Sequence, residues 1–401
     1  MDDRIFVTGL GMISPAGAGV APFWADLCAA RRRFEELTPL YAGMKPGVLG
    51  ARVPEAARTV ALERITETSR ARPRAASIFA EYAALEAIAD AGLAPGDPGL
   101  RNAVVCVGTN DGQADVLEDL VAGRRDITGS GGLSSYSIAD GVARAVGAAG
   151  PVFTLHNTCA SSNVALSCAL EMLRAGVADT AVVGGCDAYS EKNIIGFSSL
   201  HAIGPVGCQP FSRGRRFVTP SEGAGIMVLR TGRAAAAGGR RPYAELLTVA
   251  VNNDARHPTA PDPEGVVDCH RRALDQCGLK ADDIDAVFAH GTGSRANDST
   301  EGAIFAETYP RAAITAIKGT VGHLMGGAGA AGAVAACLAL EERLVPPTAV
   351  DPADVELDID LVTGAPRAVP ELRYVQNNAF GFGGYNAIAI FGAASPGAGD
   401  G

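Results

Sequence analysis

The sequence predicts an α/β protein, because short β-rich segments alternate with helical segments along its 401 residues. Residues 75–91 and 161–175 carry apolar side chains at helical spacing, and each stretch ends next to a glycine, Gly92 or Gly176. Alternation of this kind is typical of layered α/β architectures. The clearest buried strands are expected at residues 5–8, 103–108, 180–184, 225–229, 286–289 and 387–391.

The order of elements is repeated. ALEAIADAGL is followed by AVVCVGTN in the first part of the chain, and ALDQCGLKADD is followed by IDAVFAHGTG in the second. Each pair gives a helix, a turn, a buried strand and a Gly-Thr dipeptide. We therefore expect two similar halves, residues 1–238 and 239–401. The aperiodic Ala/Gly/Arg segment 232–242 is expected to form the crossover between them.

Composition excludes several classes of protein. The 44 acidic residues against 34 basic ones give a formal net charge of −10, which disfavours nucleic acid as a ligand. The amino-terminal MDDRIFVTGLG does not have the pattern of a signal peptide, and no apolar run reaches the length of a membrane span. Nine scattered cysteines without a CxxC pair indicate reduced thiols. We expect a cytoplasmic protein with no nucleic-acid or membrane partner.

The segment FTLHNTCASSNVALSCALEML places Cys159 between a buried strand, residues 152–155, and a helix that starts near Ala160. The free N–H groups and the positive dipole of a helix start lower the pKa of a thiol, so Cys159 is a candidate nucleophile. The same N–H groups can bind the oxyanion of a reacting thioester. From this segment alone, a small core cysteine is an equally good interpretation.

Two histidines and a lysine lie in similar strand-to-loop contexts. His290 ends a buried strand in FAHGTGS, where glycines allow a ligand to approach the backbone. Lys318 and His323 flank a short turn in KGTVGH, ahead of an Ala/Gly helix that permits close packing. A lone core histidine and a packing helix are the alternative interpretations. The remaining candidates, His201, His257 and His270, lack such loops and are expected to be ordinary residues.

Cofactor motifs are absent from the sequence. Gly9 and Gly11 begin a dinucleotide fingerprint, but Ser14 stands at its third glycine position and Pro15 follows. A metal site made of the candidate cysteine and histidines has no local chelate spacing, so no metal is expected.

Together, NTCASS, HGTGS, KGTVGH and NNAFGFGG resemble the motifs of the decarboxylating β-ketoacyl-(acyl carrier protein) synthases, the Cys-His-His ketosynthases of the thiolase superfamily. Weaker similarity runs from VTGLGMISPAG to GGYNAIAIF, nearly the whole chain. The resemblance implies a five-layered αβαβα fold of two similar halves, in agreement with the repeated order of elements. It also implies a homodimer, or a heterodimer with a second ketosynthase-like subunit.

The resemblance implies a role for each motif residue. Cys159 would take an acyl group from the phosphopantetheine arm of an acyl carrier protein. His290 and His323 would hydrogen-bond the malonyl thioester carbonyl and stabilise the enolate left when CO₂ departs. Lys318 would order the site electrostatically. No separate cofactor is implied, because phosphopantetheine arrives with the substrate.

The last motif would supply a gate. Phe382 matches the residue whose backbone N–H completes an oxyanion hole with that of Cys159, and Phe380 would be a second gate element. The gate would further include Gly381 and Gly383, and Thr292 and Ser294 of HGTGS would contact substrate.

The sequence also departs from the family pattern. Gly332 stands where many members have a glutamate paired with the lysine, and Glu301 is a candidate replacement. Phe217 and Ser221 replace usual glycines, and Tyr385 follows GFGG where threonine is common. These changes favour a discrete enzyme of polyketide synthesis over the housekeeping fatty-acid enzyme.

Two alternatives remain. A non-catalytic partner subunit that shapes chain length would typically lack the nucleophile, so Cys159 disfavours it. A thiolase or a CoA-primed condensing enzyme would have a Cys-His-Asn or Cys-His-Cys site, so His323 disfavours both.

Overall fold

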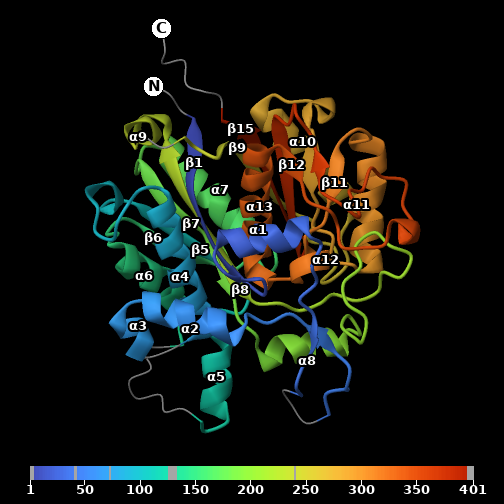
Figure 1. The fold of residues 1–401 in the computed structure, drawn as a ribbon, viewed down its shortest axis with the longest axis horizontal. Helices are drawn as coiled ribbons and strands as arrows, with labels where there is room; N and C mark the ends of the chain where they lie inside the picture. Colours follow the sequence, from blue (N-terminus) through green and yellow to red (C-terminus); the bar gives the residue numbers. More distant parts are fainter. Residues whose placement is uncertain (1–3, 40–42, 72–73, 125–132, 239–240, 395–401) are drawn as a thin grey trace.

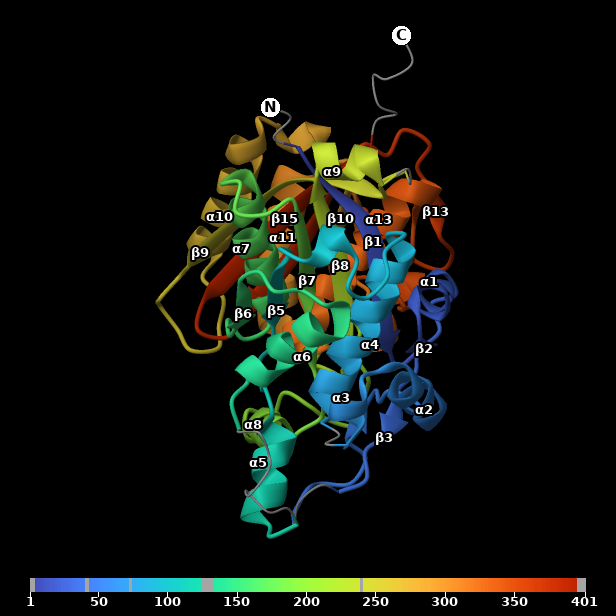
Figure 2. The same cartoon turned by 90° about the vertical axis from the view of Figure 1, so that its left-hand side faces the viewer.

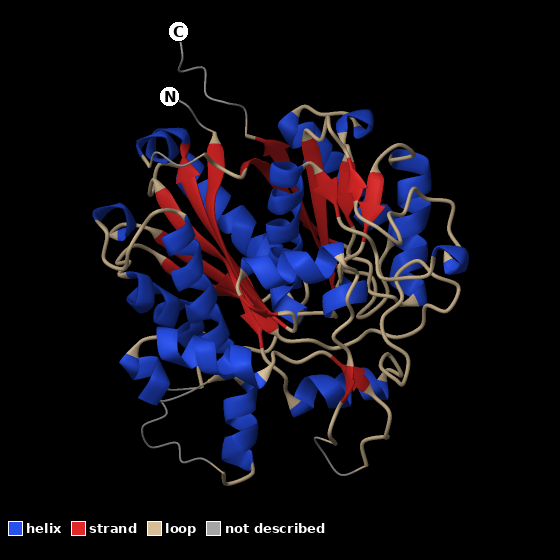
Figure 3. Cartoon of the chain, viewed as in Figure 1, coloured by secondary structure: helices blue, strands red, loops and turns tan. Residues whose placement is uncertain are grey.

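A computed structural model describes residues 4–39, 43–71, 74–124, 133–238 and 241–394. These residues form a mixed α/β protein with a large 11-stranded sheet (Figure 3). The first part of the chain contributes β1 (Ile5–Ser14), β2 (Gly17–Ala18), β5 (Val104–Gly108), β6 (Val152–Leu155), β7 (Thr180–Asp187) and β8 (Gly223–Thr231). The second part contributes β9 (Ala244–Asn253), β10 (Ala286–Phe288), β11 (Ala313–Thr315), β14 (Tyr374–Gly381) and β15 (Tyr385–Ala393).

The two parts of the sheet repeat one strand order. Outward from the junction they run β1-β8-β7-β5-β6 and β9-β15-β14-β10-β11. In both, the outer three strands are mutually parallel and the two inner pairs are antiparallel. At the junction, β1 and β9 pair through Phe6 with Glu245 and Val7 with Ala244. The strand topology is therefore duplicated. The expected boundary between residues 238 and 239 stays a prediction, because residues 239–240 lie outside the described part of the chain.

Helices make three of the five layers (Figures 1 and 2). Between the two halves of the sheet lie α7 (Ser161–Arg174) and α13 (Ala328–Glu342), which contact each other and strands of both halves. The outer face of the first half is covered by α4 (Ala75–Asp90) and α6 (Tyr136–Val146). The outer face of the second half is covered by α10 (Pro263–Cys277) and α11 (Arg295–Thr308). The expected αβαβα architecture is confirmed.

Peripheral elements surround these layers. The helices are α1 (Val20–Cys28), α2 (Glu55–Arg64), α3 (Glu67–Ala71), α5 (Ala114–Val121), α8 (Glu191–Ser199), α9 (Gly232–Ala237) and α12 (Lys318–Val321). Two small ladders pair β3 (Glu35–Glu36) with β4 (Leu49–Gly50) and β12 (Leu344–Val345) with β13 (Arg367–Ala368). No helix within the described ranges has the length and apolar character needed to cross a membrane.

Small residues allow these layers to approach closely. A side chain at Gly9 or Gly11 of β1 would overlap the backbone of α4. The central helix α13 is buried along Ala328–Leu340 because Gly and Ala dominate its surface. Close packing of this kind brings the loops at the ends of the central helices next to each other.

Two elements differ from expectation. Strand β1 continues to Ser14 rather than ending at residue 8. Its pairing with β8 shifts register between Val7 and Gly9 and then continues beyond the glycines. The crossover 232–242 was expected to be aperiodic, but residues 232–237 form α9, where Thr231 caps the helix by accepting from Ala234 N. A short capped Ala-rich turn of helix does not need an amphipathic pattern.

Candidate active site

Cys159 lies in a tight turn between β6 and α7. Thr158, just before it, has a left-handed φ of 51°, and the helix begins two residues after it, at Ser161. The Ser161 hydroxyl closes the turn by donating to Thr158 O at 2.6 Å and accepting from Asn157 N at 2.8 Å. The thiol is nearly buried, with 7% of the residue exposed. The turn thus fixes the thiol at the start of α7.

The charge state of Cys159 differs from expectation. Burial raises the pKa of the thiol to about 12, and Asp187 and Asp111 contribute in the same direction. Lys318 acts to lower the pKa, but its effect does not offset the loss of hydration. The expected lowering by the helix start was therefore wrong in sign, because desolvation dominates. Cys159 is therefore protonated at neutral pH, as a thiol.

His290 follows β10 and is held through its main chain. Its N–H and that of Gly291 donate to the two oxygens of Glu301, at 2.8 and 2.7 Å. Lys318 Nζ donates to His290 O at 2.5 Å and lies 3.3 Å from His290 Nδ1. Because the ammonium faces Nδ1, that nitrogen acts as the acceptor and Nε2 carries the ring proton.

His323 has the same tautomer through a different contact. Met325 N donates to His323 Nδ1 at 3.1 Å, so Nε2 again carries the proton. The main chain of His323 is fixed on both sides, by Thr219 O and by Ser221 N. The two imidazole rings are 5.4 Å apart between centroids and nearly perpendicular. The site therefore holds two neighbouring imidazole donors.

Both imidazoles are neutral. Burial lowers the pKa of His290 and of His323 well below the ordinary value, and the Lys318 charge acts in the same direction. A neutral imidazole donates a hydrogen bond without gaining charge, which suits the stabilisation of a developing oxyanion.

The position of Gly332 explains the missing glutamate. A side chain at residue 332 would overlap the amide of Asn377, which donates to Gly329 O at 2.9 Å. Burial lowers the pKa of Lys318, and Glu301 is the first of the groups that counteract this. Glu301 reaches the lysine through the His290 main chain, with no direct ion pair found between these two described side chains.

The predicted gate residues lie where β14 turns into β15: Phe380 and Gly381 end β14, and Phe382 and Gly383 follow on the turn. Thr158 Oγ1 donates to Phe382 O at 2.9 Å, which ties the gate to the nucleophile turn. A side chain at Gly381 would overlap Thr158, so glycine is required there. Gly383 has a φ of 85°, and its N–H donates to Pro258 O at 2.7 Å. Phe380 is buried 5.7 Å from the His290 ring.

Two cavities meet at Cys159. The larger, of about 230 Å³, is lined by the cysteine, both histidines and the substrate candidates Thr292 and Ser294, whose hydroxyls are 2.9 Å apart. The smaller, of about 150 Å³, adjoins the cysteine on the side of Asn110, Asn193 and Phe197. Phe382 lines both cavities, and its ring is 5.8 Å from that of Phe197.

His201, His257 and His270 line neither cavity at Cys159. His270 is buried, with Nδ1 near the Tyr309 hydroxyl, and burial lowers its pKa to about 3. His257 is exposed and accepts from the Thr259 and Ala260 amides, and His201 is exposed on a turn. No group of three or more His, Cys, Asp or Glu side chains within the described ranges is arranged as a metal centre.

Several residues near the cysteine were not identified from the sequence. Phe197 and Asn193 of α8 line the smaller cavity, and Asp187 and Asp111 are close enough to raise the pKa of the thiol. Asp187 had a detectable signal, because it ends an otherwise apolar strand, TAVVGGCD. A buried carboxylate at a strand end needs donors and often marks a site.

Comparisons with known proteins show the family of this chain. The family description "Beta-ketoacyl synthase, N-terminal domain" matches residues 2–235, and its C-terminal domain matches residues 243–350. Nodulation protein E of Rhizobium meliloti is 32% identical, over 98% of this chain and 99% of the relative. The 3-oxoacyl-[acyl-carrier-protein] synthase 2 of Synechocystis sp. is 31% identical over 97% of each chain.

Solved structures of similar fold include two ketosynthases. The ishigamide ketosynthase/chain length factor is 34% identical, with a TM-score of 0.89, over 98% of this chain and 99% of the other. A type II polyketide synthase acyl-carrier protein in complex with its ketosynthase, bound to the hexaketide, matches at 26% identity, with a TM-score of 0.83 and coverage of 98% and 100%.

A buried thiol, two neutral imidazoles and a lysine on this duplicated fold define a ketosynthase, an acyltransferase that forms carbon–carbon bonds in polyketide or fatty acid synthesis. The chain belongs to the β-ketoacyl synthase family.

Proposed function

We propose that this protein condenses malonyl-(acyl carrier protein) with an acyl group held as a thioester on Cys159, giving a β-ketoacyl-(acyl carrier protein). The observation that carries the proposal is the convergence of Cys159, His290 and His323 on one cavity of about 230 Å³. The thiol supplies the acyl carrier, and the two imidazoles supply the donors that decarboxylation requires.

Acyl transfer comes first. The sulfur of Cys159 attacks the thioester carbonyl, and the bond to the phosphopantetheine sulfur breaks. Because the pKa of the thiol is raised to about 12, its proton leaves during the attack and ends on the released phosphopantetheine thiol. The backbone N–H groups of Cys159 and Phe382 would bind the oxyanion, and the bond from Thr158 Oγ1 to Phe382 O at 2.9 Å holds the two segments together.

Decarboxylation follows when malonyl thioester enters the larger cavity. The bond between the carboxylate and the α-carbon breaks, CO₂ leaves, and the electron pair forms the enolate. The Nε2 protons of His290 and His323 would hydrogen-bond the enolate oxygen, since Nδ1 of each ring faces a donor. Lys318 holds the His290 backbone and adds positive charge near the enolate.

The enolate carbon then attacks the acyl carbonyl on Cys159. Collapse of the tetrahedral intermediate releases the cysteine sulfur, which regains a proton, and the β-ketoacyl product stays on the carrier. Thr292 and Ser294, which line the cavity, would contact the phosphopantetheine arm. No cofactor beyond this arm is needed, because the substrate carries it.

Partners and pathway follow from the same proposal. The substrates require an acyl carrier protein, and the chain would act as a homodimer or beside a second ketosynthase-like subunit. Similarity to the ishigamide ketosynthase/chain length factor supports a polyketide pathway, as do the departures at Phe217, Ser221 and Gly332. The cytoplasmic location expected from the sequence stays a prediction. Nine free thiols support a reducing compartment.

The test is the intact mass of the purified protein after incubation with a panel of acyl-carrier thioesters. An acyl adduct on the parent that is absent from Cys159→Ala supports the proposal and reports starter preference. Lack of an adduct with every donor contradicts it and favours the partner-subunit alternative.

A further inference from the structure

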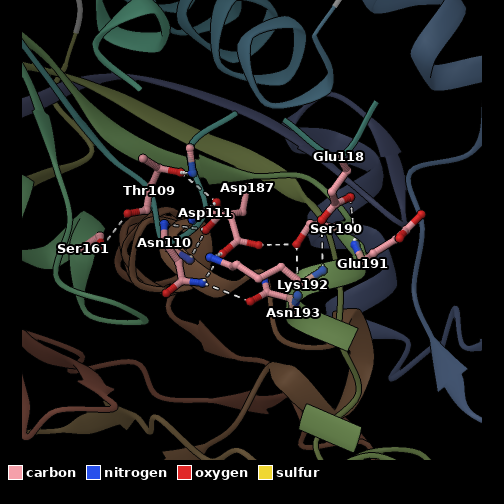
Figure 4. A network of polar contacts seen from close by, with 12 residues as sticks. Thr109, Asn110, Asp111, Glu118, Ser161, Asp187, Ser190, Glu191, Lys192 and Asn193 are labelled. Carbon is pink, nitrogen blue, oxygen red and sulfur yellow. Dashed lines mark hydrogen bonds and ion pairs between the residues drawn. The ribbon is translucent and has the colours of Figure 1, made fainter. Parts of the chain in front are cut away.

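A buried carboxylate outside the reacting set joins the end of β7 to two loops near the site, one of which is drawn in Figure 4. Asp187, at the end of β7, is fully buried. Its Oδ1 accepts from Thr109 Oγ1 at 2.7 Å and from Asp111 N at 2.9 Å. Its Oδ2 accepts from Asn110 N at 2.8 Å and from Gly326 N at 2.6 Å. All four partners donate, so the contacts are those of an ionised carboxylate.

The bond to Gly326 connects this carboxylate to His323. Gly326 is held from the opposite side as well, because Ser162 Oγ of α7 donates to its carbonyl at 2.6 Å. Met325, the preceding residue, has a left-handed φ of 50°, a conformation that a non-glycine residue keeps only under constraint. The Met325 N–H is the donor that reaches His323 Nδ1. Asp187 and Ser162 therefore hold Gly326, the residue after the strained one, by its N–H and by its carbonyl.

The remaining polar residues hold the far side of the carboxylate (Figure 4). Asp111 is ion-paired with Lys192 and accepts from the Ser190 hydroxyl, both at the start of α8. Burial, and the nearby Asp111 charge, raise the pKa of Asp187 to about 7 against the effect of its donors. The network thus keeps a costly buried charge in place. It reaches the His323 loop through Gly326, and it reaches the Cys159 turn through Thr109, whose carbonyl accepts from Ser161 Oγ at 3.1 Å.

We propose that Asp187 is a positioning residue for decarboxylation: it holds Gly326 so that Met325 N–H fixes the tautomer of His323. Loss of this anchor releases the strain at Met325 and removes the donor from Nδ1. In a fraction of the molecules the imidazole proton then resides on Nδ1 instead of Nε2. In these molecules Nε2 no longer donates a hydrogen bond into the cavity. The inference rests on the proposed function, since it assigns Asp187 to one of its two half-reactions.

Asp187→Asn is the direct test. Each carboxylate oxygen of Asp187 accepts two hydrogen bonds. In either orientation of the asparagine amide, its NH₂ group therefore faces two donors and cannot accept from them. We expect malonyl decarboxylation to fall about 100-fold, the scale for misplacing a catalytic group by ~1 Å. Acylation of Cys159 is expected not to fall, because it does not use His323 and because loss of the Asp187 charge acts to lower the pKa of the thiol. Both steps are followed by intact mass, on Cys159 and on the carrier.

The matched control is Thr109→Val, which removes one donor from the same carboxylate and leaves the bond to Gly326. Thr109→Val is expected to lower the melting temperature without a larger loss of decarboxylation than of acylation. An equal fall of both steps in Asp187→Asn, or the same separation in Thr109→Val, overturns the inference. A parent protein that neither acylates nor decarboxylates contradicts the proposed function instead.

A double-mutant cycle tests whether Asp187 acts through His323. In a His323→Ala background, Asp187→Asn is expected to cause no further loss of decarboxylation, whereas multiplicative losses overturn the inference. Should Asp187→Asn not fold, Ser162→Ala loosens the other side of Gly326. It is expected to separate the steps in the same direction, and unchanged decarboxylation in that variant also overturns the inference.

Discussion

At the scale of single residues, His323 carries the sharpest prediction. His323→Ala removes one of two donors to the enolate oxygen and leaves the cysteine turn intact. Decarboxylation of malonyl carrier is expected to fall by about 100-fold or more, as for other oxyanion donors, and acylation by much less. Mass spectrometry of the carrier and of Cys159 measures both steps. His201→Asn, on an exposed turn, is the control, and equal losses of both steps in His323→Ala would show that its role is misassigned.

The raised pKa of Cys159 predicts the pH dependence of alkylation. Only the thiolate reacts, so below a pKa of about 12 the labelling rate by iodoacetamide should rise about tenfold per pH unit. Lys318 stabilises the thiolate, so Lys318→Met is expected to slow labelling at each pH. The adduct mass, with Cys159→Ala as the blank, gives the rates. A rate that levels off near neutral pH would contradict this prediction.

The motifs predicted which side chains meet at the site, but not their charge states. Cys159, His290, His323 and Lys318 were predicted together because NTCASS, HGTGS and KGTVGH resemble family motifs, and the structure brings the four side chains together. The pKa of Cys159 depends on how completely the fold covers it, and this comes from residues distant in sequence. The sequence therefore predicted which side chains meet. It did not predict that burial outweighs the helix start in setting the pKa of Cys159.

At the scale of elements, the packing of α13 on β14 explains Gly332. A methyl group there would overlap Asn377, so Gly332→Ala is expected to destabilise the fold by about 1–3 kcal/mol. The helix propensity of alanine recovers only about 1 kcal/mol of this. Urea unfolding measures the difference. Gly196→Ala on α8, with open space around it, is the control and should not destabilise; stabilisation by Gly332→Ala would contradict the expected overlap.

Element prediction succeeded where the local pattern was strong. The helix expected at residues 75–91 is α4 (Ala75–Asp90), because its apolar spacing and following Gly92 agree. The prediction ended β1 too early, at residue 8, because the glycines that follow indicated the end of the strand. In the ten-residue β1 these glycines allow α4 to approach closely and do not form a turn. The Asp187 contacts join residues up to 139 positions apart, and no local pattern encodes such pairs.

At the scale of the whole molecule, one end of the sheet is open. Strand β6 ends the strand order and pairs with β5, and Phe153 on it is 37% exposed. Exposed edges invite pairing with another chain, so we expect β6 to lie in the subunit interface. Phe153→Asp is expected to convert dimers to monomers in light scattering. Val177→Asp, away from this strand, is the control, and an unchanged dimer in Phe153→Asp would contradict the placement.

The shared position of Cys159 between two cavities constrains the timing of turnover. An acyl chain that lies in the smaller cavity would leave the larger cavity free, whereas a carrier arm in the larger cavity would block a second arm. The first carrier must therefore depart before the malonyl carrier enters. Steady-state kinetics should follow a substituted-enzyme scheme, with parallel double-reciprocal plots and mutual inhibition by excess of either carrier.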